Sequence, residues 1–424
     1  MKKKFPGGKT WPESNFIYHQ PFEVLPDPPK LSLPLWRGGR AAVQPGESLE
    51  RYALIGHDSR GLPVYAPLAG RVEQVGEFQH LWIRPQGLDF PKLTVTIRAD
   101  ASQPETVPPL GPKPRFWELT HGELCQRLYQ AGVMDVRYQD LPPVIIYNAL
   151  DLEPPLSANL RLLEERTAEL IEGMRILNQL HRARFSRIVL CCRQQKLAER
   201  LKAMLASAVN TWLHPVEPVY PQEADRLLKE EVCPDDRAAI YDMQQVLWAR
   251  QAVVLGRPVI LRHVTVFNQG LGRARNLEVL LGTPSGYILG VKVASGDGEQ
   301  SGRSHDFFDS FADKTLVLGG MLSGRSFYSL EMPVDRETKG VLLITRRTLK
   351  SKPCHNCGAC HSLCPAGLYP SEIAAAVDKG DRRRISALKP EGCLDCGLCA
   401  WACPSGLELC QQIEVARMMS AGRL

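Results

Sequence analysis

Eight of the chain's 13 cysteines lie between Cys354 and Cys403, in two copies of one pattern. Each copy has the spacing C-x2-C-x2-C-x3-C-P, so that proline directly follows the fourth cysteine. The first copy is Cys354, Cys357, Cys360 and Cys364, and the second is Cys393, Cys396, Cys399 and Cys403. A secreted disulfide scaffold distributes its cysteines through a short chain. The clustered arrangement therefore indicates metal binding in a reducing compartment.

This spacing is the one that bacterial two-cluster iron–sulfur proteins use. Three thiolates at positions i, i+3 and i+6 of a tight loop converge on three corners of a cubane, and the glycine after the second cysteine lets the backbone pass close to it. The fourth cysteine starts a segment that points away, so it reaches the other cluster. We expect cluster 1 to bind Cys354, Cys357, Cys360 and Cys403, and cluster 2 to bind Cys393, Cys396, Cys399 and Cys364.

Zinc is the alternative metal. Zinc sites are tetrahedral and usually combine two C-x2-C hairpins, or cysteines with histidines. Two complete quartets, each followed by proline, match that pattern poorly. The other five cysteines lack ligand spacing, and we interpret them as buried apolar residues or helix residues. They are Cys125, Cys191, Cys192, Cys233 and Cys410.

Length and charge narrow the class of protein further. A chain of 424 residues is long enough for two to four domains. The net charge is +6, and the Lys and Arg residues are spread along the chain rather than concentrated, so we expect no nucleic-acid partner. No apolar run approaches the roughly 20 residues that span a bilayer, and the basic start lacks the apolar stretch of a signal peptide. We expect a cytoplasmic protein, able to associate peripherally with the cytoplasmic face of a membrane complex.

The remaining sequence predicts a multidomain α+β fold. Residues 1–30 are rich in proline and aromatics and indicate an extended arm. Residues 31–100 are predicted to form short strands with glycine turns, similar to a biotinyl-type barrel sandwich but without a lysine at the hairpin tip. Residues 101–257 alternate helix and strand, residues 258–345 are rich in strands, and residues 346–424 form the helical two-cluster domain.

Within the α/β segment, the apolar periodicity predicts particular elements. A helix is expected over 122–131, followed by a buried strand at 144–147. One long amphipathic helix is expected over 157–182, with Ser157 as its N-cap. A strand at 188–190 and a helix at 194–205 complete the unit.

Taken in order, the motifs resemble the RnfC-type subunit of ion-translocating ferredoxin:NAD reductase complexes. The similar segments, from the N-terminal end onwards, are Phe5-Pro6-Gly7-Gly8, Ala66-Pro67-Leu68-Ala69-Gly70, Tyr220-Pro221-Gln222, Gly282-Thr283-Pro284, Gly319-Gly320-Met321 and the two cysteine motifs. The resemblance implies a barrel-sandwich-like domain at 31–100, a domain like the flavoprotein subunit of complex I at 101–257, an SLBB (soluble-ligand-binding β-grasp) domain at 258–345 and a ferredoxin-type domain at 346–424.

That family binds FMN and NADH through a glycine loop, and here the matching stretch, 133–142, has lost the glycines. It carries Asp135 and Asp140, together with the bulky Met134, Arg137 and Tyr138. A phosphate cradle needs backbone amides at close range, which side chains prevent. We therefore expect these two carboxylates to repel phosphate.

A second family element survives in part, because Asn148, Asp151 and Glu153 match its polar positions. Two interpretations remain open. Either these three residues still hold a flavin, or the fold is kept as a scaffold whose nucleotide site no longer binds. We expect the second, with no bound FMN and no oxidation of NADH by the isolated chain.

The sequence thus predicts an electron-transfer subunit of an oxidoreductase complex, with two [4Fe–4S] clusters and no catalytic side chains of its own. Its expected partners are other redox subunits, either flavoproteins or ferredoxin-like proteins. One alternative is an NAD(P)H-oxidising FMN and iron–sulfur subunit with a diverged nucleotide loop. Another is a scaffold or assembly subunit.

Overall fold

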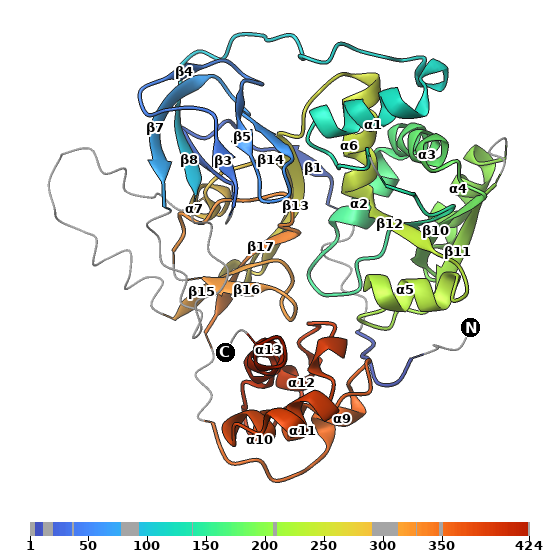
Figure 1. Cartoon of the computed structure of the whole chain (residues 1–424), viewed down its shortest axis with the longest axis vertical. Coiled ribbons are helices and arrows are strands. Elements are labelled where there is room, and N and C mark those ends of the chain that lie inside the picture. The colour runs from blue at the N-terminus through green and yellow to red at the C-terminus, as the bar shows by residue number, and fades with distance from the viewer. Residues whose placement is uncertain are drawn as a thin grey trace, which may run out of the picture.

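The computed structural model describes residues 5–11, 20–35, 38–77, 93–137, 139–206, 210–290, 313–327, 329–346 and 351–422. Figure 1 shows a β-rich part beside an α/β part, with a helical part, coloured red, below both. The helical part contains the two cysteine motifs. The first described segment of the chain, near the label N, lies close to this helical part although it is more than 300 residues away in sequence.

Two small antiparallel sheets form the β-rich part. One has the strand order β2-β8-β7-β4 and the other has the order β3-β5-β6. Their bounds are β2 Lys30–Pro34, β3 Arg40–Ala41, β4 Ser48–Leu49, β5 Leu54–His57, β6 Pro63–Tyr65, β7 Gly70–Gly76 and β8 Thr94–Ala99. Leu33, Ile55 and Ile97 are almost fully buried and belong to one hydrophobic cluster, so the two sheets share a core.

A six-stranded mixed sheet follows, in the order β1-β14-β13-β17-β15-β16. Its strands are β1 Phe22–Val24, β13 Leu261–Asn268, β14 Arg273–Leu280, β15 Lys314–Leu318, β16 Arg325–Phe327 and β17 Gly340–Thr345. β1 comes from the predicted arm and pairs in parallel with β14, with Phe22 opposite Asn276. The N-terminal segment is therefore an integral edge strand of a sheet formed by residues about 250 positions later.

The α/β part is built on a four-stranded parallel sheet with the order β11-β10-β9-β12. The strands are β9 Val144–Asn148, β10 Phe185–Cys191, β11 Thr211–Val216 and β12 Ala238–Asp242. Every residue of β9 is buried, as expected for an interior parallel strand whose sequence is a continuous apolar run. Its helices are α1 His121–Gln130, α2 Ala158–Glu165, α3 Thr167–His181, α4 Gln195–Met204, α5 Asp225–Val232 and α6 Met243–Val254.

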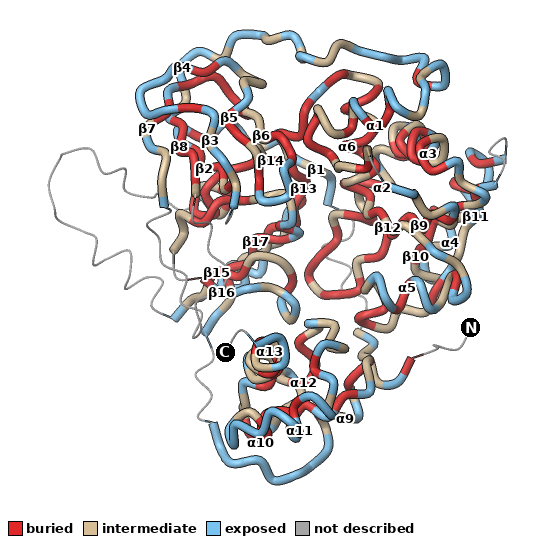
Figure 2. The backbone as a smooth tube through the Cα atoms, viewed as in Figure 1, coloured by how far each residue is buried: buried red, intermediate tan, exposed pale blue. Residues whose placement is uncertain are grey.

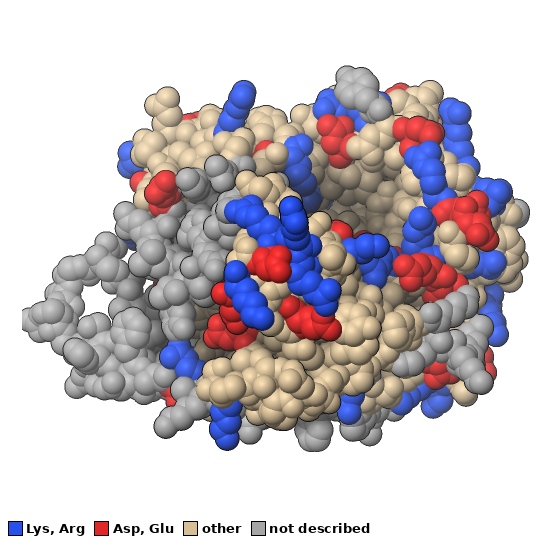
Figure 3. All heavy atoms as spheres, turned by 60° about the horizontal axis from the view of Figure 1, so that its bottom comes forward, with Lys and Arg blue, Asp and Glu red and all other residues tan. Residues whose placement is uncertain are grey.

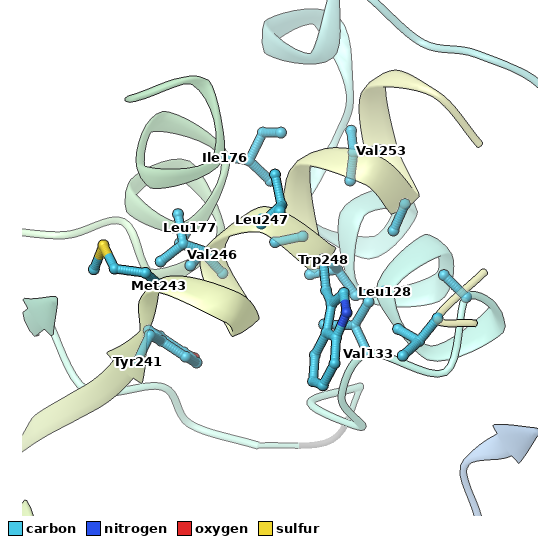
Figure 4. Close-up of a cluster of buried hydrophobic side chains, with 14 of the residues drawn as sticks. Leu128, Val133, Ile176, Leu177, Tyr241, Met243, Val246, Leu247, Trp248 and Val253 are labelled. Atoms are coloured by element: carbon cyan, nitrogen blue, oxygen red, sulfur yellow. The ribbon is translucent and has the colours of Figure 1, made fainter. Parts of the chain in front are cut away.

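Helix α6 is the centre of the α/β core (Figure 4). It starts directly after β12, where Asp242 accepts a hydrogen bond from the Gln245 amide and Gln245 in turn accepts one from the Asp242 amide. This reciprocal capping box fixes the turn from strand to helix. Val246 and Leu247 then face α3, while Trp248 packs toward α1 and its indole N–H donates to the Leu261 carbonyl over 3.0 Å.

The expectation of one long helix over 157–182 was wrong. The structure has two helices, α2 and α3, separated at Arg166, whose φ of −111° leaves the helical region. The Thr167 hydroxyl donates to the Leu163 carbonyl over 2.5 Å, which competes with the regular helical pattern at this point. The Ser157 side chain makes no capping bond either, because its hydroxyl donates to Asn276 of β14 instead.

The helical C-terminal part contains α9 Ala359–Ser362, α10 Pro370–Asp378, α11 Arg382–Ala387, α12 Leu398–Trp401 and α13 Leu409–Ser420. Ile373, Ile385 and Ile413 are almost fully buried and form its small core. In Figure 2 the outer sides of these helices are exposed and their facing sides are buried. Among the described residues, no helix combines the length and the apolar character that crossing a lipid bilayer requires.

Helices α3 and α6 cross at Gly173. A Cβ atom there would lie 2.4 Å from the Val246 carbonyl oxygen. We predict that Gly173→Ala lowers the free energy of unfolding by about 1–3 kcal/mol, because the helices must separate. Gly122→Ala is the matched control: this α1 glycine is exposed, and a Cβ there meets nothing within 4 Å. It should stabilise by up to about 1 kcal/mol. Chemical denaturation measures both, and equal effects would contradict the packing argument.

Candidate functional site: two cysteine motifs held against the protein body

The two cysteine motifs adopt the same local backbone. Asn356 and Asp395, each two residues after the first cysteine of its motif, have left-handed φ angles of 55° and 53°. The glycines that follow the second cysteines, Gly358 and Gly397, have φ angles of 73° and 74° and begin the short helices α9 and α12. Glycine adopts this region without the steric cost that other residues incur. The repeated sequence therefore produces two copies of one tight loop.

Backbone amides point at several of the cysteine sulfurs. The Asn356 amide donates to Cys354 Sγ over 3.4 Å, and the Asp395 amide donates to Cys393 Sγ over the same distance. The Leu368 amide donates to Cys364 Sγ over 3.3 Å. Such N–H···S bonds favour the charged thiolate, which is the form that ligates iron.

Four cysteines of the predicted cluster 2 lie together around one small cavity. They are Cys393, Cys396 and Cys399 from the second motif and Cys364 from the first. Leu368, Ile413 and Cys410 also line this cavity. The structure therefore brings the fourth cysteine of one motif to the first three cysteines of the other.

The other predicted set is more open to solvent. Cys354 and Cys357 are exposed, Cys360 is buried and Cys403 is partly buried. Among the described residues, no three His, Cys, Asp or Glu side chains gather tightly enough to hold a single metal ion.

The histidines of the first motif have protein partners. The His355 ring lies 3.0 Å from the Ser405 hydroxyl, and His361 stacks on Tyr369 with its ring centroid 4.0 Å away. His361 also lies 2.8 Å from the Leu368 carbonyl. The contacts of His361 join the segment between Cys360 and Cys364 to the residues that directly follow Cys364.

Burial changes the acidity of the cavity cysteines. It raises the pKa of the Cys393 thiol to about 11 and that of the Cys396 thiol to about 12. Without a metal these two thiols are protonated at neutral pH. Iron must displace their protons when it binds, so loading of the site is coupled to proton release.

The second motif is anchored to the α/β part by Tyr220 and Glu153. The Tyr220 hydroxyl donates to the Cys396 carbonyl over 2.7 Å and lies 3.5 Å from the Glu153 carboxylate. That carboxylate is buried and accepts hydrogen bonds from the amides of Leu322 and Ser323 and from the Ser323 hydroxyl. A buried carboxylate with this many donors is well compensated for the loss of water. Glu153 thereby ties three distant segments together.

Two glycines make this contact possible. A Cβ on Gly320 would lie 2.0 Å from the Glu153 carboxylate, and a Cβ on Gly397 would lie 2.3 Å from the Leu322 carbonyl oxygen. The turn from Gly319 to Gly324 is thus held between Glu153 on one side and the cluster loop on the other. Glycine at 320 is required by this approach, a role that the sequence pattern alone did not reveal.

The N-terminal segment supports the first motif in the same way. Gly7 and Gly8 both have left-handed φ angles, 61° and 82°. The Gly8 amide donates to the Leu363 carbonyl over 3.1 Å, and a Cβ on Gly7 would lie 2.5 Å from that carbonyl group. Lys9 then exchanges two backbone hydrogen bonds of 2.9 Å with Tyr220. The segment therefore connects the turn before Cys364 to the tyrosine that holds Cys396.

The three residues of the predicted residual flavin site are engaged within the protein. Asn148 donates to the Glu223 carbonyl over 3.0 Å and accepts from the Leu150 amide. Asp151 accepts from the Leu160 amide over 2.8 Å, and burial raises the pKa of its carboxyl group to about 7. Glu153 has the partners described above. All three lie at or beyond the carboxyl end of β9.

The stretch that matches the family's glycine loop leads to the opposite end of β9. The Pro142 carbonyl lies 2.8 Å from the His181 ring, and Asp140 pairs over 2.8 Å with Arg237, which directly precedes β12. Asp135 pairs over 3.0 Å with Arg137. Each of these two carboxylates therefore has an arginine partner, and their repulsion of phosphate stays a prediction. Tyr138, named with this stretch, lies outside the described residues.

Comparison with known proteins first identifies the class of domain that contains the two cysteine motifs. A family model described as a 4Fe-4S dicluster domain matches residues 347–407, which include both cysteine motifs. The chain therefore carries an iron–sulfur domain of the two-cluster type, as its cysteine spacing predicted.

Relatives extend the similarity to most of the chain. The C-type subunit of the ion-translocating oxidoreductase complex from Rhodobacter capsulatus is 28% identical over 85% of this chain and 72% of its own length. Proteins of the same name from Serratia proteamaculans and Erwinia tasmaniensis are 27% and 26% identical. They match over 83% and 87% of this chain, which spans about half of their length (52% and 47%). These matches confirm the resemblance to the RnfC-like family.

Solved structures add only a distant likeness. A chain of an NAD⁺-reducing [NiFe]-hydrogenase in the H₂-reduced state is 15% identical, with a TM-score of 0.48 over 73% of this chain and 66% of that one.

The contact at Gly7 generates a prediction. Gly7→Ala should release the turn before Cys364, because the added Cβ collides with the Leu363 carbonyl. Hydrogen exchange of the amides in 363–368 should become about tenfold faster or more, equivalent to about 1.4 kcal/mol of local stability. Gly380→Ala is the control, since Gly380 has a similar φ of 65° but open space around its Cβ position. Unchanged exchange in Gly7→Ala would contradict this anchoring role.

Proposed function

We propose that this chain is an electron-transfer iron–sulfur subunit of an Rnf-type oxidoreductase complex, relaying single electrons between partner redox proteins. The observation that carries the proposal is the cavity in which Cys364 meets Cys393, Cys396 and Cys399. When bound, each [4Fe–4S] cluster supplies reversible one-electron chemistry. The chain itself provides thiolates, directed amides and an apolar surround.

The donor set fits such clusters. Thiolates are the ligands that iron–sulfur clusters prefer, and the amides of Asn356, Asp395 and Leu368 point at three of the sulfurs. Hydrogen bonds to ligand sulfurs and limited solvent access are the means by which a protein sets the reduction potential. We assign Cys354, Cys357, Cys360 and Cys403 to cluster 1, and Cys393, Cys396, Cys399 and Cys364 to cluster 2.

The ligand sets of cluster 1 and cluster 2 differ in their exposure to solvent. This difference supports one side of the helical part as the docking site for partner proteins. The Cys396–Gly397 loop is packed against the protein body through Tyr220 and Leu322. Cys354 and Cys357, in contrast, are exposed. Because electron transfer slows steeply with distance, a partner redox protein gains most by docking at the Cys354–Cys357 loop.

The surface near the helical part is mixed in charge. On the face turned forward in Figure 3, Lys and Arg side chains lie beside Asp and Glu side chains. Within the helical part, Arg384 pairs with Glu372, and Arg417 pairs with Asp395 over 2.7 Å. We infer a protein partner, either a flavoprotein or a ferredoxin-like subunit, and peripheral association with a membrane complex.

The finer domain assignment is part of the same proposal. It comprises an N-terminal arm at 1–30, a barrel-sandwich-like domain at 31–100, a flavoprotein-like α/β domain at 101–257, an SLBB-like domain at 258–345 and a ferredoxin-type domain at 346–424. The separate antiparallel sheets, the parallel sheet and the helical part support it.

A second candidate function is oxidation of NAD(P)H through FMN. It is favoured by the parallel sheet, whose order β11-β10-β9-β12 changes direction between β9 and β12. Doubly wound sheets bind nucleotides at the carboxyl edge of such a switch point, and Asn148 and Asp151 lie there. Both side chains are, however, used by the protein's own backbone.

The crossover of ligands can be tested with three variants. The wild-type chain should carry about eight irons, four for each cluster. Cys403→Ser should lose about half of them and leave the same electron paramagnetic resonance (EPR) spectrum as Cys357→Ser. Cys396→Ser should instead lose cluster 2 and keep the EPR spectrum of cluster 1. The half-buried Cys192, far from both motifs in sequence, provides the control Cys192→Ser. If Cys403→Ser instead resembles Cys396→Ser, the assignment is wrong; stoichiometric zinc in place of iron would reject the proposed function.

The isolated chain should neither contain FMN nor oxidise NADH. The stretch 133–142 has no glycine to bring backbone amides close to a phosphate, and the polar residues at the end of β9 are already bonded within the protein. Denatured protein should release no flavin, and NADH should leave the visible absorption unchanged while dithionite bleaches it. Stoichiometric FMN, or rapid bleaching by NADH without a partner, would establish the second candidate instead.

A further inference from the structure

Cys410 is the one cysteine of the helical part that belongs to neither motif. It lies in the first turn of α13, between the almost fully buried Leu409 and the buried Ile413 that fix this helix in the core. Its side chain lines the same cavity as Cys364, Cys393, Cys396 and Cys399. The cavity assigned to cluster 2 is therefore surrounded by five thiols, one more than a [4Fe–4S] cluster needs.

The fifth thiol is closest to one particular ligand. Cys410 Sγ lies 3.8 Å from Cys399 Sγ, within hydrogen-bonding distance for two sulfurs. With a cluster bound, Cys399 is a thiolate without a proton, so only Cys410 can donate across this gap. The two sulfurs thus lie side by side in one cavity, so an iron bound to Cys399 Sγ would have Cys410 Sγ as a neighbour.

Among the described residues, no spare thiol lies beside the first motif in the sequence. Cys360 occupies in α9 the position that Cys399 occupies in α12. The cysteines outside the motifs other than Cys410 all precede residue 234, in the α/β part. The pair Cys360 and Cys399 therefore offers a built-in comparison between equivalent ligands, of which one has a spare thiol beside it.

We propose that Cys410 is a reserve ligand of cluster 2 that takes over the iron corner held by Cys399. In the exchange, the bond between iron and Cys399 Sγ breaks and a bond between iron and Cys410 Sγ forms. The proton of the Cys410 thiol passes to the Cys399 thiolate across the 3.8 Å contact. Charge and electron count are unchanged, so no oxidant or reductant takes part. The site can thus keep its cluster when Cys399 is damaged or dissociates.

This proposal rests on the iron–sulfur function proposed above, and four variants separate the two. The chains Cys399→Ala, Cys410→Ala, Cys399→Ala/Cys410→Ala and Cys360→Ala are purified without oxygen. Their iron and sulfide contents are measured, with EPR spectra of the oxidised and reduced states. If the wild-type chain lacks iron, the proposed function fails; if it holds about eight irons, the variants test Cys410 alone.

Cys399→Ala and Cys410→Ala should both retain about eight irons, because one thiol of the pair remains at the corner. Cys399→Ala should show a shifted spectrum for cluster 2 only, since its ligand has changed. The double variant and Cys360→Ala should fall to about four irons. A loss in Cys399→Ala as large as that in Cys360→Ala would overturn the proposal. So would a [3Fe–4S] signal in oxidised Cys399→Ala, because it would show the corner left unfilled.

The same four variants also distinguish the loss of a ligand from misfolding of the chain. The cluster that is not mutated serves as an internal control, since its EPR signal must persist in every variant. A double variant that keeps all its iron would also contradict the proposal, because no thiol then remains to hold the fourth corner.

Discussion

The buried carboxylate of Glu153 is the contact on which the arrangement of this molecule depends. It accepts hydrogen bonds from Leu322 and Ser323 and lies beside the Tyr220 hydroxyl, which holds the Cys396 carbonyl. A carboxylate in the interior is stable only when such donors replace water. Loss of one donor would leave a buried charge uncompensated, so the three segments around Glu153 are coupled. The cluster loop is in this way made part of the protein body rather than a tethered module.

This arrangement gives a structural reason for the short motifs that the chain shares with the RnfC-like family. Gly7 and Gly8 approach Leu363, Tyr220 approaches Cys396, and Gly320 approaches Glu153. Segments hundreds of residues apart therefore meet around the two turns that carry Cys364 and Cys396. Glycine is needed at these places because backbone passes against backbone or carboxylate, where a Cβ would collide. Glu153, at the carboxyl end of β9, is thereby engaged in holding the iron–sulfur domain.

The predictions that held were those with a local cause. The buried strand at 144–147 lies within β9, and the helix at 122–131 corresponds to α1. The long helix at 157–182 failed because Thr167 bonds back to Leu163 and Ser157 bonds to Asn276, a partner from another sheet. The ion pairs of Asp135 and Asp140 could not be predicted from the sequence either, because periodicity does not reveal which arginine reaches a carboxylate.

The sequence by itself determined the identity of the iron–sulfur domain, because three cysteines at i, i+3 and i+6 with a following glycine define a loop without help from the rest of the chain. It also determined the resemblance to the RnfC-like family, which depends on the order of short motifs. Only the tertiary structure decided how Cys410 faces Cys399 and how Glu153 and Gly320 meet. Those contacts join residues on separate elements, and their geometry follows from the packing of helices and sheets rather than from any local pattern.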